Sequence, residues 1–431
     1  MMRLREKHEF KMASLHVTTG IGLRTLGDAV AGRPTTLRTA QAIADAVDRP
    51  LRDLLERGYD VDEYTAETLR NRLREGSYGS ANCSAYLIGD YSVLLTKRAY
   101  MLPIAAKIHV CVEENTRTVV DLYVASGDHW VRDAELGGYV ENGLRLHLTN
   151  KLLLHHFPWC PIALRIGIVS EVPAGFGIHE ECALALALSE AIRRHCGRPE
   201  DPEGLETLLF AGALLSARYV DISWATLVAS QHGTEPAEVW SFNRNNDGGI
   251  DLLDLYESNQ RGADMEPNVY PGRALWNVVS QPQFDVNRVT VWWNEETLRA
   301  PQTSSGRHLI RKVPMSFVID QIDAAAYDGA HFPQRFGMLM RMHQLMLASV
   351  DAVRPEVQSL IARISGLPGV LGAKLAAGRE RGAIIVFGDH RFNAHEFQRR
   401  MKADRLRPLE DYLLRLDIDL ADLKRAATPK L

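Results

Sequence analysis

A glycine-containing loop that runs into a long apolar segment constrains the fold more than any other feature of this sequence. Residues 172–192 read VPAGFGIHEECALALALSEAI. The glycines let backbone N–H groups approach an anion, and the apolar run predicts a buried helix whose N-terminus carries partial positive charge. The segment is therefore a candidate phosphate-binding loop. On its own the pattern is weak, because glycine turns precede many helices.

Two more glycine-bearing segments occur in the chain. Residues 86–105 read YLIGDYSVLLTKRAYMLPIA, and residues 369–387 read GVLGAKLAAGRERGAIIVF, preceded by FGMLMRMHQLM at 336–346. In this order, over about residues 80–390, the segments resemble the GHMP kinase superfamily, and galactokinase most of all. The resemblance implies a two-lobed α+β fold that binds ATP and Mg2+ and phosphorylates small hydroxyl substrates such as sugars.

Several residues that carry the chemistry in that family are replaced here. The serines that face phosphate and Mg2+ fall on His179, Glu180 and Glu181. Carboxylates at these positions should repel ATP, because like charges about 4 Å apart cost ~4 kcal/mol at an effective dielectric near 20, whereas the helix dipole offers about 0.3–1 kcal/mol. The family's catalytic Asp falls on Thr226, which cannot act as a base near neutral pH. We therefore expect no catalytic residue, and ATP and Mg2+ as cofactors only if kinase function is retained.

The remaining candidate residues surround a ligand cleft. The family's Gly-Glu-His is Gly89-Asp90-Tyr91 here, and GAKL at 372–375 survives while the glycine run after it does not. His179 with the two acids could hold a metal, but an acidic, solvated helix cap is the favoured reading. Arg379 and Arg381 are an alternative anion site. The phosphate-loop-like residues are Pro173, Gly175, Gly177, His179, Glu180 and Glu181, and the cleft residues are Asp90, Gly372, Lys374, Gly378 and Arg379.

The N-terminal segment predicts short helices joined by tight turns. Gly20 permits a sharp turn, and Leu15, Leu26 and Ala29 face inward on the helices beside it. The spacing over residues 11–55 resembles the Cro/C1-type helix-turn-helix domain, although Met12 and Gly22 replace its usual Gln and Ser. The resemblance implies base contacts from Leu23, Arg24 and Asp28, with Arg33 and Arg38 near phosphates.

Charge alone supports this DNA-binding domain weakly. Residues 1–60 carry 10 Lys and Arg against 8 Asp and Glu, so a helical bundle for dimerisation or docking is the alternative. The whole chain has a net charge of −4, and any contact with DNA must therefore come from a local patch.

Composition places the chain among cytoplasmic globular proteins. Its 431 residues favour two or three domains. The five cysteines lack a CxxC pair, which argues against disulfides and structural zinc. The N-terminus lacks an apolar signal-peptide core, and no apolar run is long enough to cross a membrane.

The sequence thus predicts a multidomain chain. It consists of an all-α helix-turn-helix domain followed by an α+β two-lobed GHMP-kinase-like domain. We expect a homodimeric transcriptional regulator that binds a double-stranded DNA operator and senses a sugar-like effector. The alternatives are an active sugar kinase with an accessory DNA-binding domain, and an antitoxin or scaffold-like protein. The expected boundaries are 1–58 for the helix-turn-helix, 59–79 for a helical linker, 80–235 and 236–390 for the two lobes, and 391–431 for a tail that is helical over 396–424.

Overall fold

The structure of the chain is a computed structural model. It describes residues 12–30, 37–46, 63–90, 98–141, 163–197, 207–211, 230, 240–244, 276–280, 288–299, 332–349, 352–376 and 381–418, apart from residues 135, 139 and 209. Four predicted site residues lie outside this part of the chain: Arg33, Thr226, Gly378 and Arg379.

Three short helices near the N-terminus share a small apolar core. They are α1 (Met12–Thr19), α2 (Leu23–Val30) and α3 (Leu37–Ala46). Gly20, between the first two, has a φ of +66°, a left-handed conformation that glycine adopts without a steric penalty. The predicted turn and the inward-facing residues are confirmed, and the DNA-binding role of these helices stays a prediction. The core consists of Leu15, Leu26, Ala29, Ala40, Ile43 and Ala44.

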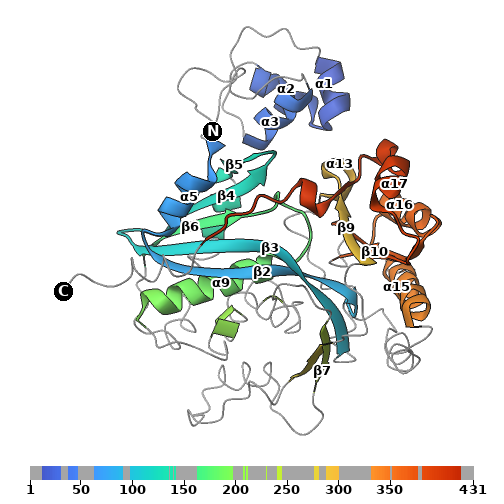
Figure 1. Cartoon of the computed structure of the whole chain (residues 1–431). Coiled ribbons are helices and arrows are strands. Elements are labelled where there is room, and N and C mark those ends of the chain that lie inside the picture. Colours follow the sequence, from blue (N-terminus) through green and yellow to red (C-terminus); the bar gives the residue numbers. More distant parts are fainter. Residues whose placement is uncertain are drawn as a thin grey trace.

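The larger sheet of the described chain has eight strands (Figure 1). Its order is β1-β5-β4-β6-β3-β7-β8, with β2 also paired to β3; β4 and β6 are parallel and every other pair is antiparallel. The strands are β1 (Glu63–Tyr64), β2 (Ser77–Ile88), β3 (Arg98–Glu114), β4 (Val119–Ser126), β5 (His129–Arg132), β6 (Leu164–Ser170), β7 (Trp240–Arg244) and β8 (Trp276–Ser280).

Helices pack on both faces of this sheet. The long helix α9 (Glu180–His195) packs against β2 and β3 on one face. Val110 and Val112 belong to the core on that face, while Cys111 between them joins the core beneath α5 (Ala66–Leu73) on the other. This alternation is what the two-residue period of a strand dictates.

A second sheet carries the last part of the described chain. Its order is β10-β11-β9-β12, all antiparallel. The strands are β9 (Val289–Trp293), β10 (Val370–Leu375), β11 (Ile384–Gly388) and β12 (Arg407–Pro408). The helices around it are α13 (Glu295–Leu298), α15 (Phe332–Ser349), α16 (Pro355–Ser365) and α17 (Ala394–Arg400), with 3-10 turns at Lys402–Asp404 and Leu409–Asp411.

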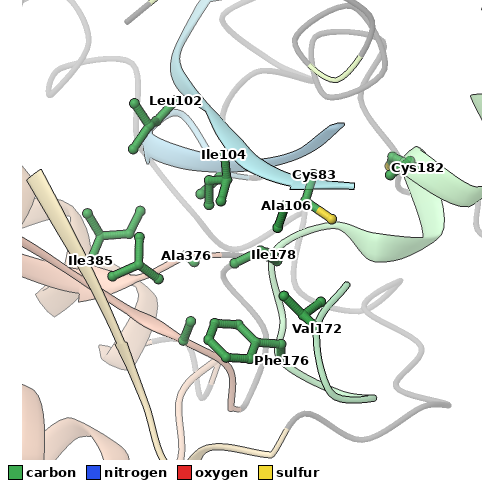
Figure 2. Close-up of a cluster of buried hydrophobic side chains, with 14 of the residues drawn as sticks. Cys83, Leu102, Ile104, Ala106, Val172, Phe176, Ile178, Cys182, Ala376 and Ile385 are labelled. Carbon is green, nitrogen blue, oxygen red and sulfur yellow. The ribbon is translucent and has the colours of Figure 1, made fainter. Parts of the chain in front are cut away.

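One continuous apolar core joins the two sheets. Figure 2 shows Leu102 and Ile104 of the first sheet, Phe176 and Ile178 of the glycine loop, and Ile385 of the second in the same cluster. The Phe176 ring stacks on Trp293, with centroids 4.9 Å apart. The glycine loop is therefore fixed between the sheets by its own apolar side chains.

The structure corrects the predicted organisation at two places. Strand β2 begins at Ser77, and β1 pairs with β5, so parts of the expected linker 59–79 belong to the first sheet. A helix was expected over residues 396–424, but the described part of this range has only the shorter α-helix α17, which ends at Arg400. Beyond it Leu406, Leu409 and Leu416 are buried. Leu406 and Leu409 belong to the core that joins the two sheets, and Leu416 belongs to the core beneath α5, so this segment covers both cores.

Two simpler expectations concern cysteines and membranes. The four described cysteines, Cys83, Cys111, Cys182 and Cys196, are free thiols. None of the described helices has the length and apolar character needed to cross a membrane.

Candidate functional site at the glycine loop

The glycine loop has the backbone conformation that its sequence predicts. It runs from Pro173 to His179 between β6 and α9, and Gly175 and Gly177 have φ values of +79° and +81°. His179 also has a positive φ, +57°, although it has a side chain. The loop thus turns its backbone sharply just before the N-terminus of α9, where an anion would be stabilised.

The anion held by this loop is the carboxylate of Glu180. Its Oε1 accepts a hydrogen bond from the Gly177 amide at 2.9 Å, and its Oε2 accepts one from Ile178 at 3.0 Å. Hydrogen bonds to a charged acceptor contribute about 1.5–3 kcal/mol each. The sequence predicted repulsion between acids and phosphate at this position. The structure adds that the acid itself accepts hydrogen bonds from two amides of the candidate phosphate-binding loop.

His179 has a different set of partners. Its Nδ1 lies 2.8 Å from the carbonyl oxygen of Ser84, so Nδ1 carries a proton and donates it. Its ring packs edge-on against Tyr86, with centroids 5.1 Å apart, and is buried. His179 and Glu180 are thus both bonded to the protein itself. In the described part of the chain, no three His, Cys, Asp or Glu side chains gather closely enough to hold a metal ion.

Asp90 and Lys374 form a buried ion pair that connects the first and last glycine-bearing segments. The Nζ atom of Lys374 lies 2.5 Å from Asp90 Oδ2 and 2.8 Å from the Tyr86 carbonyl oxygen. Burial raises the pKa of Asp90 to about 6, and the nearby Lys374 acts against that shift. Burial lowers the pKa of Lys374, with Asp90 acting in the opposite direction.

His343 of α15 lies beside this pair and is fully buried. Its Nδ1 is 3.9 Å from Asp90 Oδ2, and burial together with Lys374 lowers its pKa well below the ordinary value, so the ring is neutral. Within the described residues, neither ring nitrogen nor Asp90 Oδ1 has a hydrogen-bond partner. The neutral ring and this carboxylate oxygen are therefore buried polar groups whose hydrogen-bonding capacity the described side chains leave unused.

Sequence reasoning placed Asp90 and Lys374 in the site but missed His343. The histidine lies in the quoted segment FGMLMRMHQLM, among apolar residues with a helical period. A single histidine in an apolar helix was the available signal, and such residues are far more often buried structural groups than ligands.

Gly372 has a packing role. A Cβ atom at this position would lie 2.7 Å from the carbonyl oxygen of Gly337 in α15, and one at Gly337 would lie 2.6 Å from Leu371. Helix and strand can touch here only because both residues are glycine. Farther along the third segment, the Ala383 amide donates to the carbonyl of Phe176 at 2.8 Å, which packs this segment onto the glycine loop. Arg381 donates to Glu356 at 3.2 Å.

The predicted DNA-reading residues lie on α2 and α3. Leu23 and Arg24 are exposed in the first turn of α2, and Asp28 is half-buried near its end. Arg38 lies in the first turn of α3. The side chains of Leu23 and Arg24 are therefore accessible, and contact with DNA stays a prediction.

Comparison with known proteins supports the fold. No protein-family profile matches the chain. Mevalonate kinase from L. major superposes with a TM-score of 0.50 at 15% identity, over 78% of this chain and 93% of that one. Galactokinase from Lactococcus lactis, complexed with galactose, superposes with a TM-score of 0.52 at 12% identity, over 79% and 97%. The chain has a GHMP-kinase fold.

One curated sequence relative gives a partial match to this fold. Mevalonate kinase from Methanothermobacter thermautotrophicus is 29% identical over 126 residues, which is 29% of this chain. The match spans 39% of the length of that relative. Mevalonate kinases and galactokinase superpose about equally well, so the GHMP-kinase fold is established without favouring the substrate of either.

Proposed function

We propose that this protein is a DNA-binding transcriptional regulator whose GHMP-kinase-fold domain senses a small hydroxyl-bearing ligand and does not transfer phosphate. The observation that carries the proposal is the pair of hydrogen bonds from the Gly177 and Ile178 amides to the carboxylate of Glu180. A phosphate at this loop would have to compete with the Glu180 carboxylate for these two amides.

ATP and Mg2+ do not fit this loop. The Glu180 carboxylate would have to leave both amides, and Glu181 adds a second negative charge in the same first turn of α9. Two like charges about 4 Å apart cost ~4 kcal/mol at an effective dielectric near 20. The resemblance also places the catalytic base on Thr226, which supplies no carboxylate. Both arguments support a domain that has lost phosphoryl transfer.

In this proposal the sensed ligand binds to Asp90 and His343, beside Lys374. Asp90 Oδ1 can accept a hydrogen bond from a ligand hydroxyl, and the N–H of neutral His343 can donate a hydrogen bond to the oxygen of that hydroxyl. A sugar or sugar-like alcohol offers such groups. Because Lys374 already compensates the charge of Asp90, a neutral ligand fits this position better than an anionic one.

The DNA-binding part of the proposal rests on α1, α2 and α3. The turn at Gly20 and the exposed Leu23 and Arg24 support a helix that enters the major groove, with a homodimer on a two-fold operator. Ligand and operator affinities would then be reciprocally coupled, typically by about 1–3 kcal/mol.

A calorimetric titration with ATP and Mg2+ tests the sensor assignment. We expect no binding by the wild-type protein at millimolar ATP. Glu180→Ser frees two loop amides and should gain measurable affinity, whereas the matched control Glu181→Ser removes the same charge and leaves the Glu180 contacts in place. Saturable micromolar binding by the wild-type protein would overturn the proposal.

The second candidate is an active kinase, favoured by the 126-residue match to a mevalonate kinase. ADP release in the presence of galactose or mevalonate distinguishes the two candidates. We expect none with either alcohol, and turnover that needs one of them would establish the kinase instead.

A further inference from the structure

Three arginines converge on one buried carboxylate away from the glycine loop. Asp121 of β4 has a side chain only 5% exposed, and its Oδ2 accepts hydrogen bonds from Arg72 of α5 at 2.5 Å and from Arg165 of β6 at 3.4 Å. Arg132 of β5 donates to its Oδ1. These residues come from four neighbouring elements, and we call them the Asp121 cluster (Figure 1).

The cluster holds more positive charge than the buried aspartate requires. Three guanidinium groups and one carboxylate leave a formal charge of +2. Glu113 lies opposite Arg165 in the β3–β6 register, but among the described residues no ion pair joins them. Arg72 alone would compensate Asp121, and it is further fixed by its bond to the Tyr123 hydroxyl and its position over that ring.

The two additional arginines face solvent. The side chains of Arg132 and Arg165 are 49% and 50% exposed, and they approach Asp121 from the strands on either side of β4. Each guanidinium has five N–H donors, and Asp121 uses only part of this capacity. The carboxylate therefore holds two guanidinium groups in place with donors left for an external oxyanion.

We propose that the Asp121 cluster binds the phosphodiester backbone of duplex DNA, a second contact in addition to the N-terminal helices. This inference rests on the proposed function. Two half-exposed guanidinium groups suit a polymeric anion, and they would offer it local positive charge on a chain of net charge −4. Residues 47–62 connect α3 to β1, and a chain of this length spans at most about 60 Å. The N-terminal helices and the Asp121 cluster can therefore contact one duplex of about 20 base pairs.

Salt dependence of DNA binding tests the cluster directly. The probe is a fluorescent 30-base-pair duplex of mixed sequence, titrated with the full chain between 50 and 200 mM NaCl. Each phosphate contact contributes about 0.9 to the slope of log K against log salt. The double variant Arg132→Gln/Arg165→Gln should therefore lower the magnitude of that slope by about 1.8.

Two further variants make the result specific. Arg363→Gln/Arg405→Gln removes the same charge from exposed arginines around the second sheet and should leave the slope unchanged. Arg132→Lys/Arg165→Lys keeps the charge and should retain most of the slope, so it decides the question if the glutamine variant unfolds. If the wild-type protein binds the duplex and all variants have equal slopes, the Asp121 cluster does not contact DNA, and only this inference is overturned. Absence of wild-type binding at every salt concentration overturns the DNA-binding function as well.

Discussion

The Nζ atom of Lys374 lies 2.5 Å from Oδ2 of Asp90, and this contact joins residues 284 positions apart in the chain. Both side chains are almost completely buried. Because one belongs to the segment after β2 and the other to β10, the ion pair fixes the second sheet relative to the first. Its loss should affect the whole GHMP-kinase-fold domain.

Lys374→Met should destabilise the protein strongly. The substitution leaves the Asp90 carboxylate buried without its cation, and breaking a buried pair in this way costs about 3–5 kcal/mol. Urea unfolding monitored by tryptophan fluorescence measures the loss. The double variant Asp90→Asn/Lys374→Met should recover part of it, and Lys402→Met, at an exposed position, should cost little. A single variant as stable as the wild type would contradict the role of the pair.

Glu171→Gln should loosen the C-terminal segment and flatten the acid dependence of stability. The carboxylate accepts hydrogen bonds from the Leu416 amide at 2.8 Å and the Lys107 amide at 2.9 Å. Burial by itself would raise the pKa of Glu171, but His109 and these amides outweigh it and lower the pKa below its ordinary value of 4.5. The stabilisation is therefore present above pH 4.5 and is lost as pH falls through the folded-state value.

Urea unfolding from pH 3 to 7 checks this dependence. In the variant, one amide donor would face the NH2 group of Gln, so we expect a loss of about 1–3 kcal/mol at pH 7 and a shallower decline in acid. Amide hydrogen exchange at Leu414 and Leu416 should accelerate at the same time. Glu67→Gln, at an exposed carboxyl of α5, is the control. Unchanged exchange at Leu416 would show that Glu171 does not anchor the segment.

Gly337→Ala should destabilise the contact between α15 and β10. The new methyl group would lie 2.6 Å from Leu371, which forces helix and strand apart at a cost of about 1–3 kcal/mol. Gly27→Ala in α2 meets no atom within 4 Å and should be neutral or stabilising, since alanine favours a helix over glycine by about 0.8–1 kcal/mol. Thermal unfolding compares the two. Equal melting temperatures would be incompatible with this packing.

Arg24→Ala should weaken binding to duplexes that the full chain selects from a random library. A bidentate arginine contact to a base contributes about 1–3 kcal/mol of discrimination, so we expect at least a fivefold loss on selected sequences and little change on unselected ones. Fluorescence anisotropy measures both. An equal loss on the two kinds of duplex would reassign Arg24 to phosphate contact.

The sequence predicts elements better than it predicts partners. The apolar run after the glycine loop identified α9, and glycine placement identified the turns at Gly20 and Gly177, because backbone conformation depends on local residue type. Glu180 was expected at the helix N-terminus, but its return to the Gly177 amide depends on loop conformation. The convergence of Arg72, Arg132 and Arg165 on Asp121 depends on strand order, which no local pattern contains.

In a loop that carries its own anion, two amides are already bonded before any nucleotide arrives. If the domain senses a small ligand as proposed, the Glu180 contacts have a physiological consequence. Changes in the cellular concentration of ATP would then leave its response unchanged, because even millimolar ATP would not displace the Glu180 carboxylate from the loop amides. The concentration of the effector alone would then set the output.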